Sequence, residues 1–151
     1  MTMDDILAFV SRRFADVDVV IASEENGAPQ VSWGDAFMTY APPTADRPPP
    51  RMPFTTIVTQ DYAGFDSASN LNRDGVFRLN VSVGRGAFDD VLGAGWEDRT
   101  FDPSALDVVM PHPVYAQQGW LCILNPSDSS RATVEGLITD AYDRAAAKHA
   151  R

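Results

Sequence analysis

The clearest alternation of apolar and polar residues lies between Val76 and Val83. Its apolar positions are Phe77, Leu79, Val81 and Val83, and its polar positions are Arg78, Asn80 and Ser82. Successive side chains of a β-strand point to opposite faces of the sheet. The pattern therefore predicts a strand with one core face and one polar face.

Helical periodicity occurs at both ends of the chain. Thr2 and Asp5 have the spacing of a capping box, and apolar residues recur after them at helical intervals, which predicts a helix from about residue 3 to 15. A second helix is expected to start near Ser130 and to carry an apolar stripe from Val134 to Ala145, with Asp140, Arg144 and Lys148 outside that stripe.

Several further segments are typical of strands. Residues 16–24 are rich in β-branched residues and stop near Asn26 and Gly27, which suggests a hairpin. Its return strand is expected near residues 30–33, with residues 35–40 as its continuation or as the next strand. Residues 54–59 form a short β-branched strand, and the apolar run 120–124 suits a central strand covered on both faces.

The remaining segments are expected to be loops and short turns. Residues 41–53 contain six prolines, so we expect an exposed, partly polyproline-like loop there. Residues 66–71 resemble a capped helical turn, and residues 87–92 can form one or two helical turns.

This order of elements predicts an α+β fold in which N- and C-terminal helices cover one face of an antiparallel sheet. Runs of strands without intervening helices argue against a doubly wound parallel sheet. The length of 151 residues, with 44% hydrophobic residues, fits one domain over residues 1–151 with a proline-rich loop at about 41–53.

Charge and residue usage exclude several classes of function. The net charge of −9 disfavours DNA, RNA and anionic lipid as partners. The apolar runs are far shorter than the roughly 18 residues of a membrane span, and acids rather than basic residues follow Met1, so we expect a cytoplasmic protein. A monomer and a homodimer both remain open.

Metal and cofactor chemistry have little support in the sequence. The two histidines, His112 and His149, and the lone Cys122 form no metal-ligand spacing, and no glycine-rich loop has the pattern of a nucleotide site. We therefore expect no dedicated metal site and no cofactor. Cys122 lies within an apolar run, which favours a buried structural role over a nucleophile.

The polar face of the predicted strand 76–83 is the first candidate site. Arg78 and Asn80 are suited to line a groove and to bind a carboxylate or amide. The alternative is a solvated face on which Arg78 pairs with an acid such as Asp61 or Asp74. Five aromatic residues are candidates for the border of such a groove: Trp33, Tyr40, Tyr62, Tyr115 and Trp120.

His112 is the second candidate. Prolines follow both Met110 and His112, and a residue before proline is restricted to extended backbone, so the imidazole is held on a stiff segment with Tyr115 close by. Stiff presentation suits a binding or catalytic side chain. The alternative is a turn in which His112 bonds a backbone carbonyl.

Longer stretches of the chain resemble a known family. Residues 53–62 (PFTTIVTQDY), 69–80 (SNLNRDGVFRLN), 112–116 (HPVYA), 119–120 (GW) and 125–127 (NPS) resemble a bacterial, largely actinobacterial, domain-of-unknown-function family, number 6194. The likeness covers nearly the whole chain. It implies family membership and no particular reaction.

The C-terminal third is also distantly similar to the MmcQ/YjbR-like proteins. The matching features are the stretch from His112 to Tyr115, the strand that begins at Trp120, and a closing helix with Ala141 and Tyr142. This resemblance implies a CyaY-like, frataxin-type sandwich and DNA binding through the sheet. We retain the fold and disfavour DNA binding, because the chain contains one lysine and has an acidic net charge.

These observations predict a binding module for a small molecule or a protein, with Arg78, Asn80, His112 and Tyr115 in its site. The alternative is a small enzyme in which His112 acts as general acid or base near Arg78. A YjbR-like DNA-binding domain is the third hypothesis.

Overall fold

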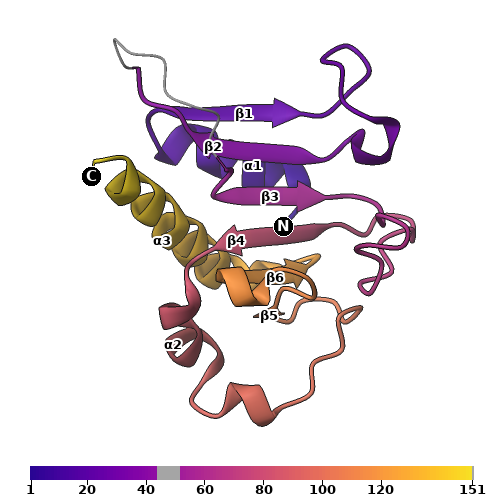
Figure 1. The fold of residues 1–151 in the computed structure, drawn as a ribbon, viewed down its shortest axis with the longest axis vertical. Helices are drawn as coiled ribbons and strands as arrows, with labels where there is room; N and C mark the ends of the chain where they lie inside the picture. The colour runs from indigo at the N-terminus through magenta and orange to yellow at the C-terminus, as the bar shows by residue number, and fades with distance from the viewer. Residues whose placement is uncertain (44–51, 151) are drawn as a thin grey trace.

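Antiparallel strands form one open sheet in the computed structural model, which describes residues 1–43 and 52–150 (Figure 1). Within this part of the chain the sheet has six strands in the order β1-β2-β3-β4-β6-β5. Their bounds are Val17–Ile21 for β1, Ala36–Tyr40 for β2, Thr55–Val58 for β3, Arg78–Ser82 for β4, Met110–Pro111 for β5 and Trp120–Leu124 for β6.

The helices are α1 (Met3–Arg13), the short α2 (Phe88–Leu92) and α3 (Arg131–His149). The start of α1 has the predicted capping box: the Asp5 amide donates to the Thr2 hydroxyl at 3.1 Å, and the Thr2 amide donates to the Asp5 carboxylate at 2.9 Å. The predicted starts of the two long helices are therefore confirmed, although α1 ends two residues earlier than expected.

Strand register explains why one face of the sheet carries the core. Ala36 on β2 pairs with Ile57 on β3, which pairs with Leu79 on β4, and Leu79 pairs with Ile123 on β6. All four are buried, and they pack with Ile6 and Val10 of α1 and with four residues of α3: Val134, Leu137, Ile138 and Ala141. The predicted α+β fold, with the terminal helices on one face of an antiparallel sheet, is confirmed.

The opposite face of the sheet carries a mixed row of side chains. Phe37, Thr56, Asn80 and Cys122 are register partners across β2, β3, β4 and β6. Within residues 1–43 and 52–150, no long helix covers this face. The connection between β3 and β4 and the segment after β5 reach over it, and both contact Arg78. Strand β6 lies between β4 and β5, which confirms its predicted central position.

Three local predictions are wrong. Residues 30–33 contain a 3₁₀ turn (Gln30–Ser32), and the strand that pairs with β1 is Ala36–Tyr40. Residues 66–71 contain one hydrogen-bonded turn, in which the Asn70 amide donates to the Ser67 carbonyl at 3.2 Å, but no helix, and the Asp66 carboxylate binds Arg78 instead of capping a helix. The alternating strand is shorter than 76–83 and spans Arg78–Ser82. Most of the predicted proline-rich loop, residues 44–51, lies outside the described residues.

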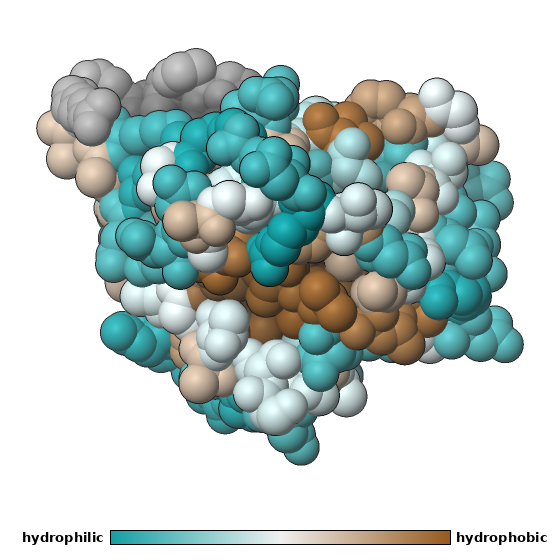
Figure 2. Space-filling view, turned by 90° about the horizontal axis from the view of Figure 1, so that it is seen from below, coloured by the Kyte–Doolittle hydropathy of each residue, from teal (hydrophilic) through white to brown (hydrophobic). Residues whose placement is uncertain are grey.

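The surface also bears on function. In the described part of the chain, no helix combines the length and apolar character needed to cross a bilayer. Viewed from below Figure 1, the surface shows a band of hydrophobic side chains between hydrophilic borders (Figure 2). Leu106 and Val108, in the connection before β5, are exposed apolar residues.

Candidate functional site

Arg78 on β4 is fully buried, on the sheet face away from the long helices. Its guanidinium forms a two-point ion pair with the Asp66 carboxylate, with Nη1–Oδ1 at 3.0 Å and Nη2–Oδ2 at 2.5 Å. Nη1 also donates to the Ser69 hydroxyl at 2.9 Å, and Nε donates to the Asn80 side-chain oxygen at 2.8 Å. These contacts attach the connection between β3 and β4 to the sheet.

The ion pair holds Asp66 in its charged form. Burial alone would raise the pKa of Asp66, but the hydrogen bonds and charge of Arg78 outweigh burial and lower it below its ordinary value. The acids proposed from sequence as partners of Arg78 are not the ones it binds. Asp61 instead accepts a hydrogen bond from the Leu71 amide at 2.7 Å.

His112 lies directly after β5 and is buried beside Arg78. Its Nδ1 accepts hydrogen bonds from the amides of Val114 and Tyr115, each at 3.0 Å. Its Nε2 lies 3.1 Å from Nη2 of Arg78. Burial and the charge of Arg78 lower the pKa of His112 to about 3, so the ring is neutral at neutral pH. The imidazole bonds backbone amides, not the backbone carbonyl considered from sequence.

Protein N–H donors face both ring nitrogens of His112. A neutral imidazole has one acceptor nitrogen, so its lone pair lies either on Nδ1, facing the amides of Val114 and Tyr115, or on Nε2, facing the guanidinium of Arg78, which can only donate. In either tautomer the lone pair is directed at a protein donor and not at a substrate.

Asn80 and Thr56 form the part of the site with unused donors. The Asn80 oxygen accepts from Arg78, and its amide nitrogen donates one hydrogen to the Thr56 hydroxyl at 3.0 Å. An amide has two N–H donors and a hydroxyl has one O–H donor. In the described residues, the second N–H of Asn80 and the O–H of Thr56 have no protein acceptor.

These residues line a cavity of about 310 Å³ on the face of the sheet opposite the long helices. We call it the aromatic cavity. Its polar residues are Thr56, Asp66, Arg78, Asn80 and His112, and its other lining residues are Phe37, Met52, Pro53, Val58, Tyr62, Phe65, Tyr115 and Trp120. The rings of Phe65 and Tyr115 meet edge to face with centroids 6.1 Å apart, and both residues are exposed.

The four residues chosen from sequence, Arg78, Asn80, His112 and Tyr115, all line the aromatic cavity. Arg78 and Asn80 do not form an open recognition surface, because the residues between β3 and β4 cover them. Their role in ligand binding stays a prediction. Of the aromatic residues proposed as a border, Tyr62, Tyr115 and Trp120 line the cavity, whereas Trp33 and Tyr40 do not.

Sequence reasoning missed a buried carboxylate beside this cavity. Asp35 is fully buried and accepts hydrogen bonds from the Tyr62 hydroxyl at 2.6 Å, the Thr59 amide at 2.7 Å and the Thr59 hydroxyl at 2.9 Å. Burial raises the pKa of Asp35 although these bonds oppose the change. Burial and the bond to Asp35 also raise the pKa of Tyr62. Asp35 has no motif around it that distinguishes it from a surface acid.

Other candidate chemistry is limited. Over residues 1–43 and 52–150, no three side chains of His, Cys, Asp or Glu lie together as a metal-binding group. Cys122 is buried as predicted, and burial raises the pKa of its thiol to about 12.

Comparison with known proteins gives a family without an assigned activity. A family of unknown function, DUF6194, matches residues 1–151. No match was found among curated proteins or among solved structures. The likeness to the MmcQ/YjbR-like proteins and the bacterial origin therefore stay predictions. Because the match spans the full length of the sequence, the chain belongs to the DUF6194 family.

Proposed function

We propose that this chain binds a small, uncharged molecule with a flat apolar body and a hydrogen-bond acceptor, in the aromatic cavity. The cavity supports this proposal because its walls are mainly apolar and aromatic and only a few polar residues face it. Five aromatic side chains line it: Phe37, Tyr62, Phe65, Tyr115 and Trp120. Ligand pockets are commonly apolar and aromatic, with a few polar groups that orient the ligand, and span about 300–1,000 Å³.

The electrostatics of the cavity favour an uncharged ligand. The charge of Arg78 is balanced by Asp66, and His112 is neutral. A charged ligand would lose its hydration shell without gaining an opposite charge that is free to pair with it. The unused donors of Asn80 and Thr56 suit a carbonyl or ring-nitrogen acceptor.

An enzyme that uses His112 as general acid or base remains the alternative. Its support is weaker, because a general base needs a lone pair within hydrogen-bond reach of the substrate. Both nitrogens of His112 already face protein donors. DNA binding has less support still, since the net charge is −9 and the guanidinium of Arg78 is paired.

The first experiment is a nuclear magnetic resonance titration of the full chain with benzamide, an uncharged ring that carries a carbonyl acceptor. We expect chemical-shift changes at the amides of Thr56 and Asn80 and around Tyr115. A thermal-shift screen of larger uncharged aromatic molecules follows, because a ligand that binds only the folded state raises the melting temperature.

Three variants locate the binding site. Phe65→Ala removes an exposed aromatic side chain at the cavity and should weaken binding at least several-fold, whereas Leu106→Ala removes another exposed apolar side chain, outside the cavity, and should not. Thr56→Val removes a donor with little change of shape and should also weaken binding. Shift changes that map elsewhere, or equal affinities of the Phe65 and Leu106 variants, would rule out the aromatic cavity as the site.

A further inference from the structure

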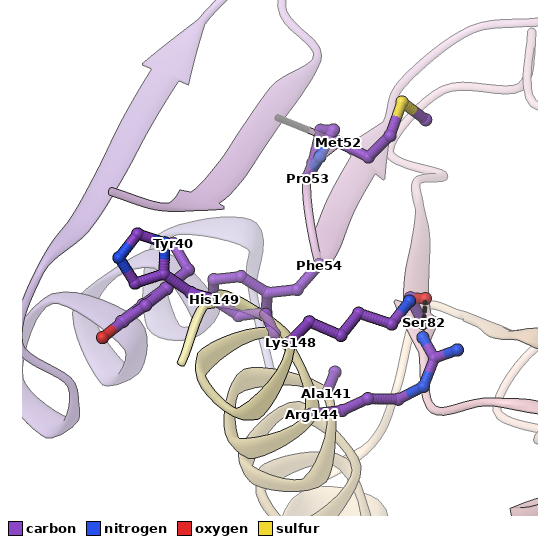
Figure 3. Close-up of a pocket in the computed structure, with 10 residues that line it drawn as sticks. Tyr40, Met52, Pro53, Phe54, Ser82, Ala141, Arg144, Lys148 and His149 are labelled. Atoms are coloured by element: carbon purple, nitrogen blue, oxygen red, sulfur yellow. Dashed lines mark hydrogen bonds between the residues drawn. The ribbon is translucent and has the colours of Figure 1, made fainter. Parts of the chain in front are cut away.

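A second cavity, of about 390 Å³, lies between α3 and the sheet, and we call it the α3 cavity (Figure 3). Apolar side chains from two parts of the chain line it: Met52, Pro53 and Phe54 before β3, and Ala141 and Ala145 on α3. Neither Arg78 nor His112 lines it, so its polar groups differ from those of the aromatic cavity. Met52 and Pro53 line both cavities.

The charge of the α3 cavity is opposite to that of the whole chain. The sequence has 21 acidic and 12 basic residues, yet the described lining contains Arg144 and Lys148 and no carboxylate. In residues 1–43 and 52–150, no carboxylate oxygen lies within 4.0 Å of a side-chain nitrogen of either residue. Lys148 is the only lysine in the sequence. Arg144 and Lys148 therefore both line a largely apolar cavity, and neither forms an ion pair with an acid of the described residues.

Arg144 is held in place by neutral groups. Its Nη1 donates to the Ser82 hydroxyl at the end of β4 at 3.1 Å. Its Nε lies against Gly84, where a Cβ atom would come within 3.0 Å of it. The absence of a side chain at Gly84 therefore makes room for the guanidinium. Figure 3 shows Arg144 and Lys148 reaching from α3 in the same direction, toward Ser82.

The spacing of the two cations is slightly unfavourable for the helix, and Asp140, four residues before Arg144, offsets part of this cost. Arg144 and Lys148 are four residues apart on α3, and like charges at this spacing destabilise a helix by about 0.2–0.5 kcal/mol. The negative end of the helix dipole accounts for Lys148 in the last turn. It does not account for Arg144, whose side chain is fixed by Ser82, away from the end of the helix.

We propose that the α3 cavity binds an organic carboxylate, with the carboxylate group between Arg144 and Lys148 and its apolar body against Phe54 and Met52. A guanidinium presents parallel N–H donors that match the two oxygens of a carboxylate, and an ammonium adds a second positive charge. The apolar walls select a carboxylate that carries a hydrocarbon or aromatic group over an inorganic anion. His149 is not required, since its ring packs edge to face on Tyr40.

The test is a titration of the full chain with 3-phenylpropionate, followed by nuclear magnetic resonance. We expect shift changes at Ser82, at Gly84 and in the last turns of α3. The uncharged analogue 3-phenylpropanamide should not produce them. Inorganic phosphate and phenyl phosphate form the other two arms: tighter binding of either one than of 3-phenylpropionate would overturn the choice of a carboxylate ligand.

Charge variants provide the control. Arg144→Gln and Lys148→Gln should each weaken 3-phenylpropionate binding by about tenfold or more, because each removes a charge-assisted hydrogen bond. Arg131→Gln makes the same change at the other end of α3 and should leave the affinity unchanged. Arg144→Lys, which keeps the charge and loses the planar fork, should bind more weakly than wild type.

Binding of 3-phenylpropionate in the α3 cavity can be tested separately from binding of benzamide in the aromatic cavity. Phe65→Ala alters only the aromatic cavity and should leave 3-phenylpropionate binding intact. Absence of shift changes at millimolar 3-phenylpropionate, or equal affinities of the Arg144, Lys148 and Arg131 variants, would overturn the α3 cavity as a carboxylate site whether or not benzamide binds.

Discussion

The guanidinium of Arg78 and the carboxylate of Asp66 form a two-point ion pair that is almost completely removed from water. Arg78 is on β4 and Asp66 is in the connection from β3, so the pair fixes that connection on the sheet. Aromatic residues of the same connection, Tyr62 and Phe65, line the aromatic cavity. The ion pair therefore positions part of the cavity wall.

Replacing Asp66 with Asn should destabilise the protein by about 3–5 kcal/mol, because it leaves the buried charge of Arg78 without a counter-charge. Urea unfolding would measure the loss. Asp74→Asn is the matched control: it lies in the same connection, is exposed, and should change the free energy of unfolding by less than about 0.5 kcal/mol. A similar small loss in both variants would contradict the structural role of the pair.

Because burial lowers the pKa of His112, we expect the protein to lose stability in acid. Its pKa is about 3 in the folded protein and 6.5 in its ordinary state, so between these values the unfolded chain binds a proton that the folded chain does not. Stability then rises with pH in this window, by up to about 1.4 kcal/mol per pH unit from this group. The same contribution is lost as the pH falls from 6.5 toward 3.

His112→Asn tests this assignment. The side-chain oxygen of Asn can accept the amide hydrogens that Nδ1 accepts in the wild type, and it does not titrate. Urea unfolding between about pH 4 and 7 should give a flatter pH dependence for the variant. The comparison reports His112 together with its effect on the neighbouring Asp66, because the other acidic and basic groups are common to both proteins. Equal slopes would show that His112 does not cause the acid sensitivity.

Position 119, next to β6, has no room for a side chain. Its φ is +91°, and a Cβ atom there would lie 2.6 Å from Cα of Gly84, which is backbone and cannot rotate away. Gly119→Ala should therefore cost more than the roughly 1–2 kcal/mol of left-handed backbone alone. Gly75 has a φ of +73° with nothing within 4 Å of the added atom, so Gly75→Ala should show only the backbone cost. Thermal unfolding of the two variants gives the comparison, and equal losses would refute the steric argument.

The parts of the fold that local periodicity determines were predictable. Alternation around Leu79 correctly separated the core side of β4 from the side that carries Arg78. Periodicity did not reveal that Arg78 is covered, because this depends on which acid of the connection just before β4 reaches it. Asp61, Asp66 and Asp74 were all near enough in sequence, and only the path of the connection selects Asp66.

The α3 cavity was also not predictable from local periodicity. Arg144 and Lys148 were correctly placed outside the apolar stripe of the last helix, but that stripe does not indicate that Ser82 and Phe54 lie opposite them. The return strand of the first hairpin was misplaced for a different reason. Gln30–Ser32 forms a 3₁₀ turn, and the chain reaches the sheet only after Gly34. Short segments with strand-like composition do not reveal whether a partner strand is within reach.

The Tyr62–Asp35 hydrogen bond should stabilise the folded protein by an amount that depends on pH. Asp35 has a pKa above its ordinary value of 3.8, because burial disfavours the carboxylate more than its hydrogen bonds favour it. Tyr62→Phe removes the shortest of those bonds, at 2.6 Å, and should destabilise the ionised state by about 1.5–3 kcal/mol. A protonated Asp35 depends less on that donor. The difference in unfolding free energy between wild type and Tyr62→Phe should therefore be largest near neutral pH and should shrink as the pH falls toward the pKa of Asp35.

Tyr40→Phe is the matched control, since the Tyr40 hydroxyl makes no side-chain hydrogen bond to any residue in 1–43 or 52–150 and lies away from Asp35. Its effect on stability should be small and independent of pH. A pH-independent loss in Tyr62→Phe would mean that the hydroxyl supports packing rather than the charge of Asp35. Tyr62 also lines the aromatic cavity. Measuring the affinity for benzamide at the same pH values would show whether protonation of Asp35 changes ligand binding through the Tyr62 hydroxyl.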